Sequence, residues 1–70
     1  MSRFLAYRLL TGPDTAEFCH RVTAALAQGW SLHGHPVYAH DPATGTMRCG
    51  QAVVKDVEGP YAPDMTLGEL

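Results

Sequence analysis

Three histidines and a tryptophan fall within one twelve-residue stretch, GWSLHGHPVYAH, at positions 29–40. His33 and His35 alternate along an expected strand, which would place both imidazoles on one face about 7 Å apart. Two such imidazoles can share a zinc ion, and a thiolate from Cys49 on the next strand could add a ligand. Structural zinc sites usually have four clear ligands at tight spacings, and this set is incomplete. We therefore interpret His33 and His35 as the solvent-facing side of an edge strand, expect no cofactor, and keep zinc as the alternative.

The two cysteines raise the question of nucleophilic catalysis. Cys19 and His20 are neighbours in the sequence, and on a helix their side chains would point about 100° apart. Cys49 would need a histidine of the preceding strand within hydrogen-bond reach, and Asp41 or Gln51 to orient that histidine. Most of this geometry is unspecified by the sequence, so a cysteine-based enzyme is the weakest of the hypotheses and no catalytic residue is assigned.

Length and charge restrict the class of protein. A chain of 70 residues forms one small domain, and its core buries only about 60% of the surface of the unfolded chain. The net charge is −2. Binding to a nucleic acid backbone needs several cations on one face, whereas the five basic residues are scattered along the chain. These residues are Arg3, Arg8, Arg21, Arg48 and Lys55. We expect no nucleic-acid partner.

The sequence carries no recognisable targeting or membrane segment. No apolar run approaches the roughly 20 residues that cross a bilayer. The first ten residues, MSRFLAYRLL, have one arginine and a short apolar stretch but no cleavage site of small residues. We expect a cytoplasmic protein, and in that reducing compartment Cys19 and Cys49 would be free thiols.

A strand and a helix are predicted in the first half of the chain. In the strand at 3–10, Leu5, Tyr7 and Leu9 share one face, and the other face carries Phe4, Ala6, Arg8 and Leu10. The helix is expected to run to about Gln28. Its apolar stripe at helical spacing consists of Phe18, Val22, Ala25 and Leu26.

The ends of this helix have recognisable signals. Asp14 is the preferred N-cap, because Glu17 follows at the capping-box position; Thr11 with Pro13 just inside is a competing start. Glu17 is also expected to pair with Arg21 one turn later. At the other end, Gly29 suits the left-handed residue that closes a helix. Trp30 can then fold back onto the last turn and fill the core.

The second half reads as a β-hairpin. Strands are expected at 30–39 and 47–55, joined by the turn HDPATGT. Pro36 lacks an N–H and places its strand at a sheet edge, so the strand order is 1-3-2. The predicted fold is α+β, a β-α-β-β domain over residues 1–56 with one helix on a three-stranded antiparallel sheet. Residues 57–70 form a C-terminal tail that is largely irregular.

One helix covers only one face of such a sheet, and the third strand is apolar on both. Exposed apolar patches often mark partner surfaces, so we predict a homodimer with Trp30 and Gly29 as structural residues and Val54 near the interface. The alternative is that the C-terminal tail covers the second face. Gln51 either bonds across the interface or is turned outward by a bulge at Gly50, which could also mark a close approach by Trp30; the outward turn is preferred.

Four segments resemble a known family: YRLLTGPD (7–14), FCHRV (18–22), GWSLHGHP (29–36) and MRCGQAVVK (47–55). They are similar to the small bacterial domain of unknown function 1737 family over residues 7–55. The resemblance implies a short bacterial α+β domain without an established activity, and it supplies no catalytic residues. The leading hypothesis is therefore a non-enzymatic, self-associating module that binds a second copy, with another protein as a further candidate partner. A metal- or ligand-binding protein that uses His33 and His35 is the alternative.

Overall fold

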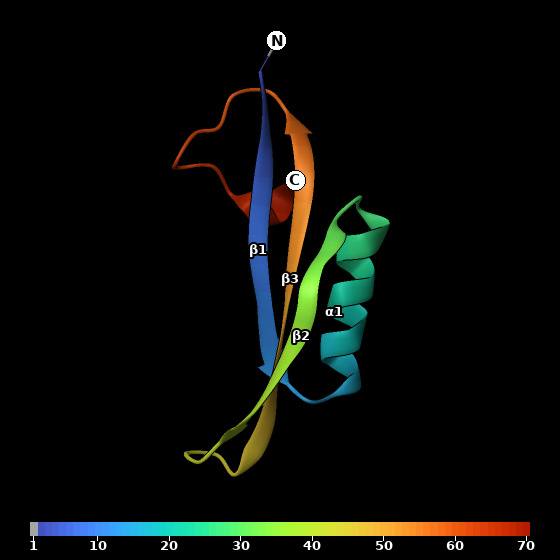
Figure 1. Cartoon of the computed structure of the whole chain (residues 1–70), viewed down its shortest axis with the longest axis vertical. Coiled ribbons are helices and arrows are strands. Elements are labelled where there is room, and N and C mark those ends of the chain that lie inside the picture. The colour runs from blue at the N-terminus through green and yellow to red at the C-terminus, as the bar shows by residue number, and fades with distance from the viewer. Residues whose placement is uncertain (1) are drawn as a thin grey trace.

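The structure of residues 2–70, a computed structural model, places one helix against a twisted three-stranded antiparallel sheet (Figure 1). Its elements are β1 (Arg3–Pro13), α1 (Ala16–Ala27), β2 (Ser31–Asp41), β3 (Thr46–Glu58) and a short 3-10 helix, η1 (Leu67–Glu69). The sheet order is β1-β3-β2. The predicted α+β class, element order and strand order are confirmed. Across residues 2–70, no helix has the length and apolar character needed to span a membrane.

All three strands extend beyond the predicted boundaries. β1 runs on through Thr11, Gly12 and Pro13 because their backbones stay in register with β3, where Gly12 lies opposite Cys49. β3 continues to Glu58, which lies opposite Arg3. The molecule is consequently elongated, with principal extents of 48 × 23 × 19 Å.

The start of α1 differs from the prediction. Thr15, not Asp14, occupies the N-cap position, and its side chain makes no capping hydrogen bond. The Asp14 carboxylate instead accepts a hydrogen bond from the Tyr38 hydroxyl at 2.6 Å. A tertiary contact with β2 has therefore replaced the local cap that the sequence pattern predicts.

The predicted pair of Glu17 and Arg21 is also wrong. Arg21 Nη1 donates to the main-chain oxygen of Thr11 at 2.8 Å, which ties the first turns of α1 to the end of β1. A backbone carbonyl near the chain reversal competes successfully with an exposed carboxylate whose pairing on a helix surface is worth only about 0.2–0.5 kcal/mol.

The end of α1 follows the sequence closely. Gly29 has φ of 99°, the left-handed conformation that glycine adopts without strain. Its N–H donates to Leu26 and the N–H of Trp30 donates to Ala25, at 3.2 and 3.1 Å. This pair of bonds is the Schellman arrangement, and it directs the Trp30 side chain back beneath the helix.

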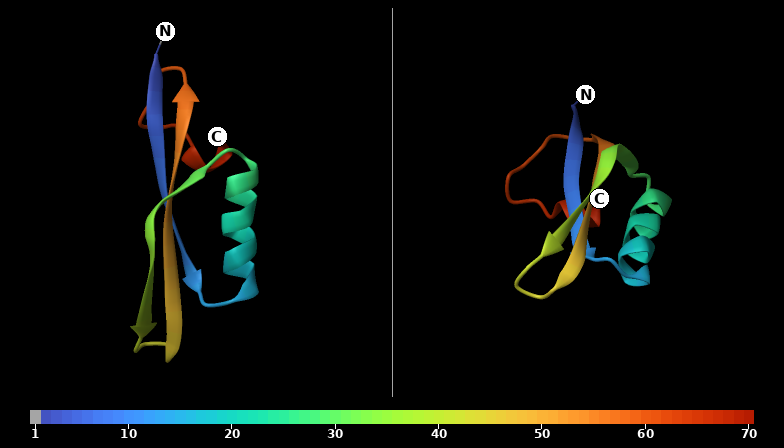
Figure 2. Two further views of the ribbon diagram at one scale, coloured as in Figure 1. Left: turned by 45° about the vertical axis from the view of Figure 1, so that its right-hand side comes forward. Right: turned by 60° about the horizontal axis from the view of Figure 1, so that its bottom comes forward.

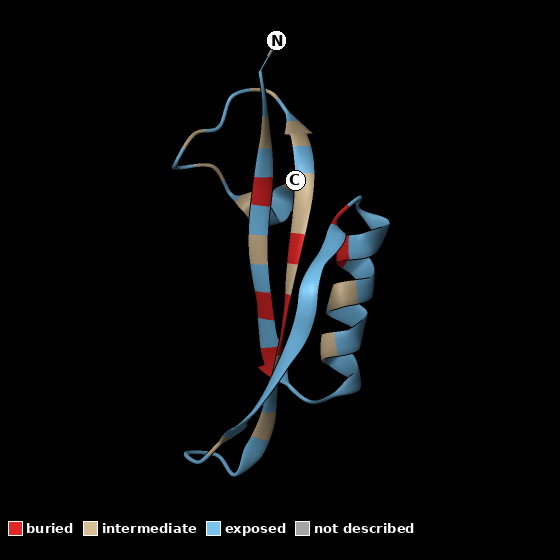
Figure 3. Cartoon of the chain, in the orientation of Figure 1, coloured by how far each residue is buried: buried red, intermediate tan, exposed pale blue. Residues whose placement is uncertain are grey.

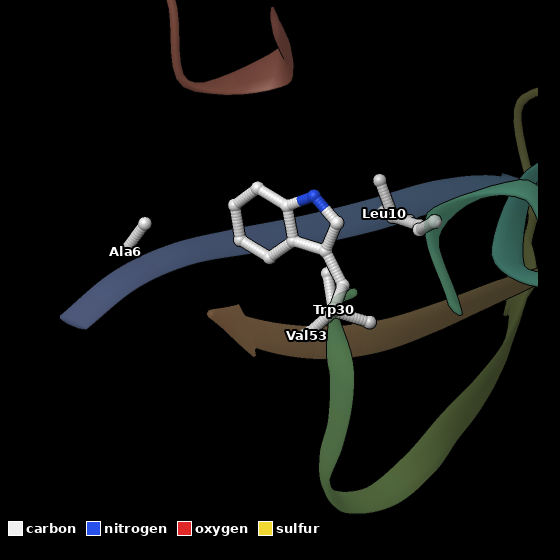
Figure 4. Close-up of a cluster of buried hydrophobic side chains, with 5 residues drawn as sticks. Ala6, Leu10, Trp30 and Val53 are labelled. Atoms are coloured by element: carbon white, nitrogen blue, oxygen red, sulfur yellow. The ribbon is translucent and has the colours of Figure 1, made fainter. Parts of the chain in front are cut away.

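Trp30 forms the centre of the core. Its side chain is 2% exposed and packs with four other buried apolar residues (Figure 4), namely Ala6, Leu10, Ala25 and Val53. Two cations lie over the indole ring, with Arg8 Cζ at 5.3 Å and Lys55 Nζ at 6.0 Å from the ring centroid. Such contacts add to the apolar burial because the face of the indole carries negative charge.

The C-terminal tail packs on the same side of the sheet as α1 (Figure 2). Leu67 and Leu70 lie against the core, and Tyr61 contacts Phe4 edge-to-face at 5.6 Å. Lys55 of β3 links the end of α1 to the tail, because its Nζ donates to the main-chain oxygens of Gln28 and Leu70. The alternative to the homodimer, in which the tail covers the opposite face, is therefore wrong.

Substitution of Trp30 tests this core. Because the indole contacts helix, sheet and cations together, Trp30→Ala should lower the free energy of unfolding by about 3–5 kcal/mol. That loss is comparable to the roughly 3–5 kcal/mol that a core of this size supplies. Urea denaturation followed by circular dichroism measures the change. The control, Tyr61→Ala at an exposed aromatic pair, should cost about 1 kcal/mol. Equal losses in the two variants would contradict the central role of Trp30.

Candidate functional site

The face of the sheet opposite α1, called here the open face, carries most of the large exposed apolar side chains of β1. β1 alternates strictly, so that Ala6 and Leu10 are buried and Arg8 is half-buried, while Leu5, Tyr7 and Leu9 are exposed (Figure 3). Leu5, Tyr7 and Leu9 are 67, 52 and 53% exposed. This alternation arises from the two-residue period of a strand, because one set of side chains meets the helix and the other meets solvent.

The other strands continue the open face. Tyr7 lies opposite Val54 and Leu9 opposite Ala52, and directly opposite residues of an antiparallel pair share a face. On the far side of β3, β2 adds Val37, which is 60% exposed and lies opposite Gly50. The open face is thus an apolar band from Leu5, Tyr7 and Leu9 through Ala52 and Val54 to Val37.

Charged residues lie at the two ends of this band. At one end, Arg3 Nε lies 3.2 Å from Asp56 Oδ1, and Glu58 lies opposite Arg3. At the other end, Arg48 lies opposite Ala39 and Pro13. The first end therefore carries a net negative charge, whereas Arg48 at the other end shares its face with Asp41, which lies opposite Thr46.

The structure separates the candidate metal ligands. His33 lies opposite Ala52 on the open face, but the pairing of β2 with β3 is irregular between His33 and Val37, and His35 falls inside that irregularity. The strict alternation that would align the two imidazoles is consequently lost. Cys49 lies opposite Tyr38 on the face of the sheet that α1 covers. Among residues 2–70, no group of three or more His, Cys, Asp or Glu side chains could hold a metal ion.

The same irregularity explains Gln51, whose predicted outward orientation is wrong. Gln51 is 6% exposed, and its Nε2 donates to the main-chain oxygens of Ala52 and Gly34 at 2.9 and 3.4 Å. The bulge lies in β2, not at Gly50 of β3 as predicted. A Cβ on Gly50 would lie 2.7 Å from Val37 Cγ2, so the close approach there comes from Val37 and not from Trp30.

Cys49 has the environment of a protonated thiol. Partial burial raises its pKa, and the nearby Asp14 carboxylate raises it further. The hydrogen bond to Asp14 likewise raises the pKa of the Tyr38 hydroxyl. A thiol held in its neutral form is a poor nucleophile, because the thiolate is the reacting species. Cys19 is exposed on α1, and both cysteines are free thiols.

The sequence did not predict two hollows on the face of the sheet that α1 covers. Arg8 and Arg21, with Gln28, line a hollow of about 200 Å³ between β1, α1 and η1. A second hollow of about 280 Å³, mostly apolar, lies between α1 and the irregular part of β2, where Leu32 is 54% exposed. The position of Arg8 on the otherwise apolar face of the first strand was the available signal for the first hollow.

The fold and these surfaces define a class: a small α+β domain whose antiparallel sheet is covered on one face only. Residues 4–56 match the model of the family described as domain of unknown function DUF1737. Because the match spans most of the 70 residues, the chain belongs to that family. No curated protein and no solved structure matches the chain.

The environment of Cys49 makes a prediction about its reactivity. Asp14→Asn removes the carboxylate that disfavours the thiolate, so the pKa of Cys49 should fall and its alkylation by iodoacetamide at neutral pH should accelerate. Mass spectrometry of the Cys49 peptide over time measures the rate. Asp64→Asn, in the exposed part of the tail, is the matched control and should leave the rate unchanged. An unchanged rate in Asp14→Asn would show that Asp14 does not influence the thiol.

Proposed function

We propose that this domain is a non-enzymatic self-association module, which binds a second copy of itself through the open face. The observation that carries the proposal is that other elements cover only one face of the sheet. Helix α1 and the tail both lie on one face, while Leu5, Tyr7, Leu9 and Val37 of the other are each at least half exposed. Contiguous exposed apolar surface of this kind is uncommon on monomeric proteins and typical of association sites.

The edges of the sheet favour a face-to-face pairing over the joining of strands. β2 forms one edge, and Pro36 and the irregular pairing near it disfavour the addition of another strand. At the other edge, the segment after β3 passes on the β1 side of the sheet in all three views (Figures 1 and 2). The open face is the apolar surface that remains.

The charges at the ends of the open face favour a second copy as the occupant. A two-fold axis perpendicular to the strands would run the two sheets in opposite directions. Glu58 of each copy would then approach Arg48 of the other, so two pairs of opposite charge would form across the interface. Pairs of this kind favour the antiparallel register of an interface.

The size of the open face is consistent with a modest dimer. Three strands about 4.8 Å apart, each with about nine residues rising about 3.3 Å, cover roughly 400 Å² in projection. Side-chain relief raises the accessible area above this projection, towards the lower part of the range for specific interfaces, where the standard is about 800 Å² per partner. We therefore expect a dissociation constant in the micromolar range.

Analytical ultracentrifugation tests the proposal with a matched pair of leucine variants. Leu9 and Leu32 are almost equally exposed, at 53 and 54%, but lie on opposite faces of the sheet. Leu9→Lys places a charge in the middle of the proposed interface and should weaken dimerisation by about tenfold or more, since burying an unpaired charge is costly. Leu32→Lys should leave the monomer–dimer equilibrium unchanged.

Circular dichroism first establishes that both variants are folded. A wild-type protein that remains monomeric at concentrations up to about 1 mM would contradict self-association, because that limit corresponds to only about −4 kcal/mol of binding free energy. A dimer that Leu9→Lys leaves intact, or that Leu32→Lys disrupts equally, would show that the open face is not the interface.

A further inference from the structure

The hollow beside Trp30 has a composition unlike the rest of the surface. It has a volume of about 200 Å³ and lies where β1, the last turns of α1 and η1 meet. Two arginines and an amide, from Arg8, Arg21 and Gln28, line it together with small or apolar residues. No acidic side chain is among the lining residues.

Arg8 and Arg21, which line the hollow, form no salt bridge with an acidic side chain. Within residues 2–70, the ion pair of Arg3 with Asp56 is the one salt bridge, and it lies at the end of the open face. Arg8 is half-buried over the Trp30 ring, and Arg21 uses Nη1 on the oxygen of Thr11. A guanidinium has five N–H donors in a planar fork, so both arginines retain donors for a further acceptor.

The Trp30 indole lies in the core next to the hollow. Trp30 is 2% exposed, yet its Nε1–H has no hydrogen-bond partner. The indole nitrogen lies towards Leu10 rather than Ala6 (Figure 4), and Leu10 also lines the hollow. The indole does not line the hollow, but the Arg8 guanidinium that lies over its ring does, so Trp30 can report on a ligand held by Arg8.

The geometry points to an anion site at this hollow that takes a phosphate group, with Arg8 and Arg21 as its charged donors. The Gln28 amide completes the set of donors. A phosphate group carries a charge of about −1.5 to −2 at neutral pH and three strong acceptor oxygens. It therefore matches two guanidinium groups and several donors better than a carboxylate, which has one charge and two oxygens.

The site is independent of the proposed dimer. Arg8 is on the face of β1 that α1 and the tail cover, whereas the dimer would use the opposite face. Loss of phosphate binding therefore leaves self-association intact, and failure of self-association leaves this site untouched.

Intrinsic fluorescence provides a direct test, because Trp30 is the single tryptophan of the chain. The full-length protein is titrated with inorganic phosphate, and with acetate in parallel, while sodium chloride keeps the ionic strength constant so that screening does not vary. Phosphate should change the Trp30 emission saturably with a dissociation constant in the millimolar range or tighter, at least about tenfold below that for acetate. Isothermal titration calorimetry gives the same constants without relying on fluorescence.

Variants locate the site. Arg21→Gln should weaken phosphate binding by about tenfold or more, because it removes a charge-assisted donor. Arg48→Gln removes an equal charge on the exposed hairpin and should leave the constant unchanged. Arg8→Gln provides a second variant if Arg21→Gln fails to fold.

Three results would overturn the assignment. The first is a wild-type titration with no saturable response to phosphate. The second is an acetate constant equal to that for phosphate, which would remove the charge match. The third is an equal loss of affinity in Arg21→Gln and Arg48→Gln, which would show that phosphate responds only to the net charge of the protein.

Discussion

The Trp30 indole is the contact on which the whole arrangement depends. The helix closes at Gly29, and this closure directs the indole into the junction of α1, β1 and β3. Arg8 and Lys55 lie over the ring, and Lys55 also holds the main-chain oxygens at the end of α1 and at Leu70. One side chain thereby positions the helix, the sheet and the tail relative to one another.

Because α1 and the tail both pack against the core around the Trp30 indole, both lie on one face of the sheet. Within residues 2–70, no element packs on the other face. That face remains apolar, and its burial requires something outside the monomer. The proposed dimer follows from this constraint, since small domains often supplement a limited core by oligomerisation. On the covered face, Arg8 and Arg21 also supply the positive charge of the proposed anion site.

The sequence was informative where a residue has one dominant local effect. Gly29 ends the helix, Pro36 places its strand at an edge, and alternation in β1 assigns Leu5 and Leu9 to one face and Ala6 to the other. These features suffice for the class, the strand order and the apolar second face.

The sequence was less informative where tertiary partners compete with local ones. Asp14 has the pattern of an N-cap, but Tyr38, distant in the chain, supplies a stronger partner for its carboxylate. Gln51 was expected to face outward, because the sequence does not show that the irregularity lies in β2 and exposes the Gly34 carbonyl to it. His35 has no partner in β3 for the same reason. The hollow at Arg8 and Arg21 forms where η1 of the tail packs back against β1 and α1. The hydrophobic periodicity of the sequence does not predict the path of the tail.

The most direct measurement of the central claim is an isotope-filtered nuclear Overhauser experiment on a mixture of labelled and unlabelled protein. The account predicts contacts between copies that join the methyl groups of Leu5 and Leu9 to Tyr7 and Val54 of the second copy. Contacts between copies that arise instead from the Leu26 and Leu32 side, or none from the open face at concentrations where the protein sediments as a dimer, would contradict it.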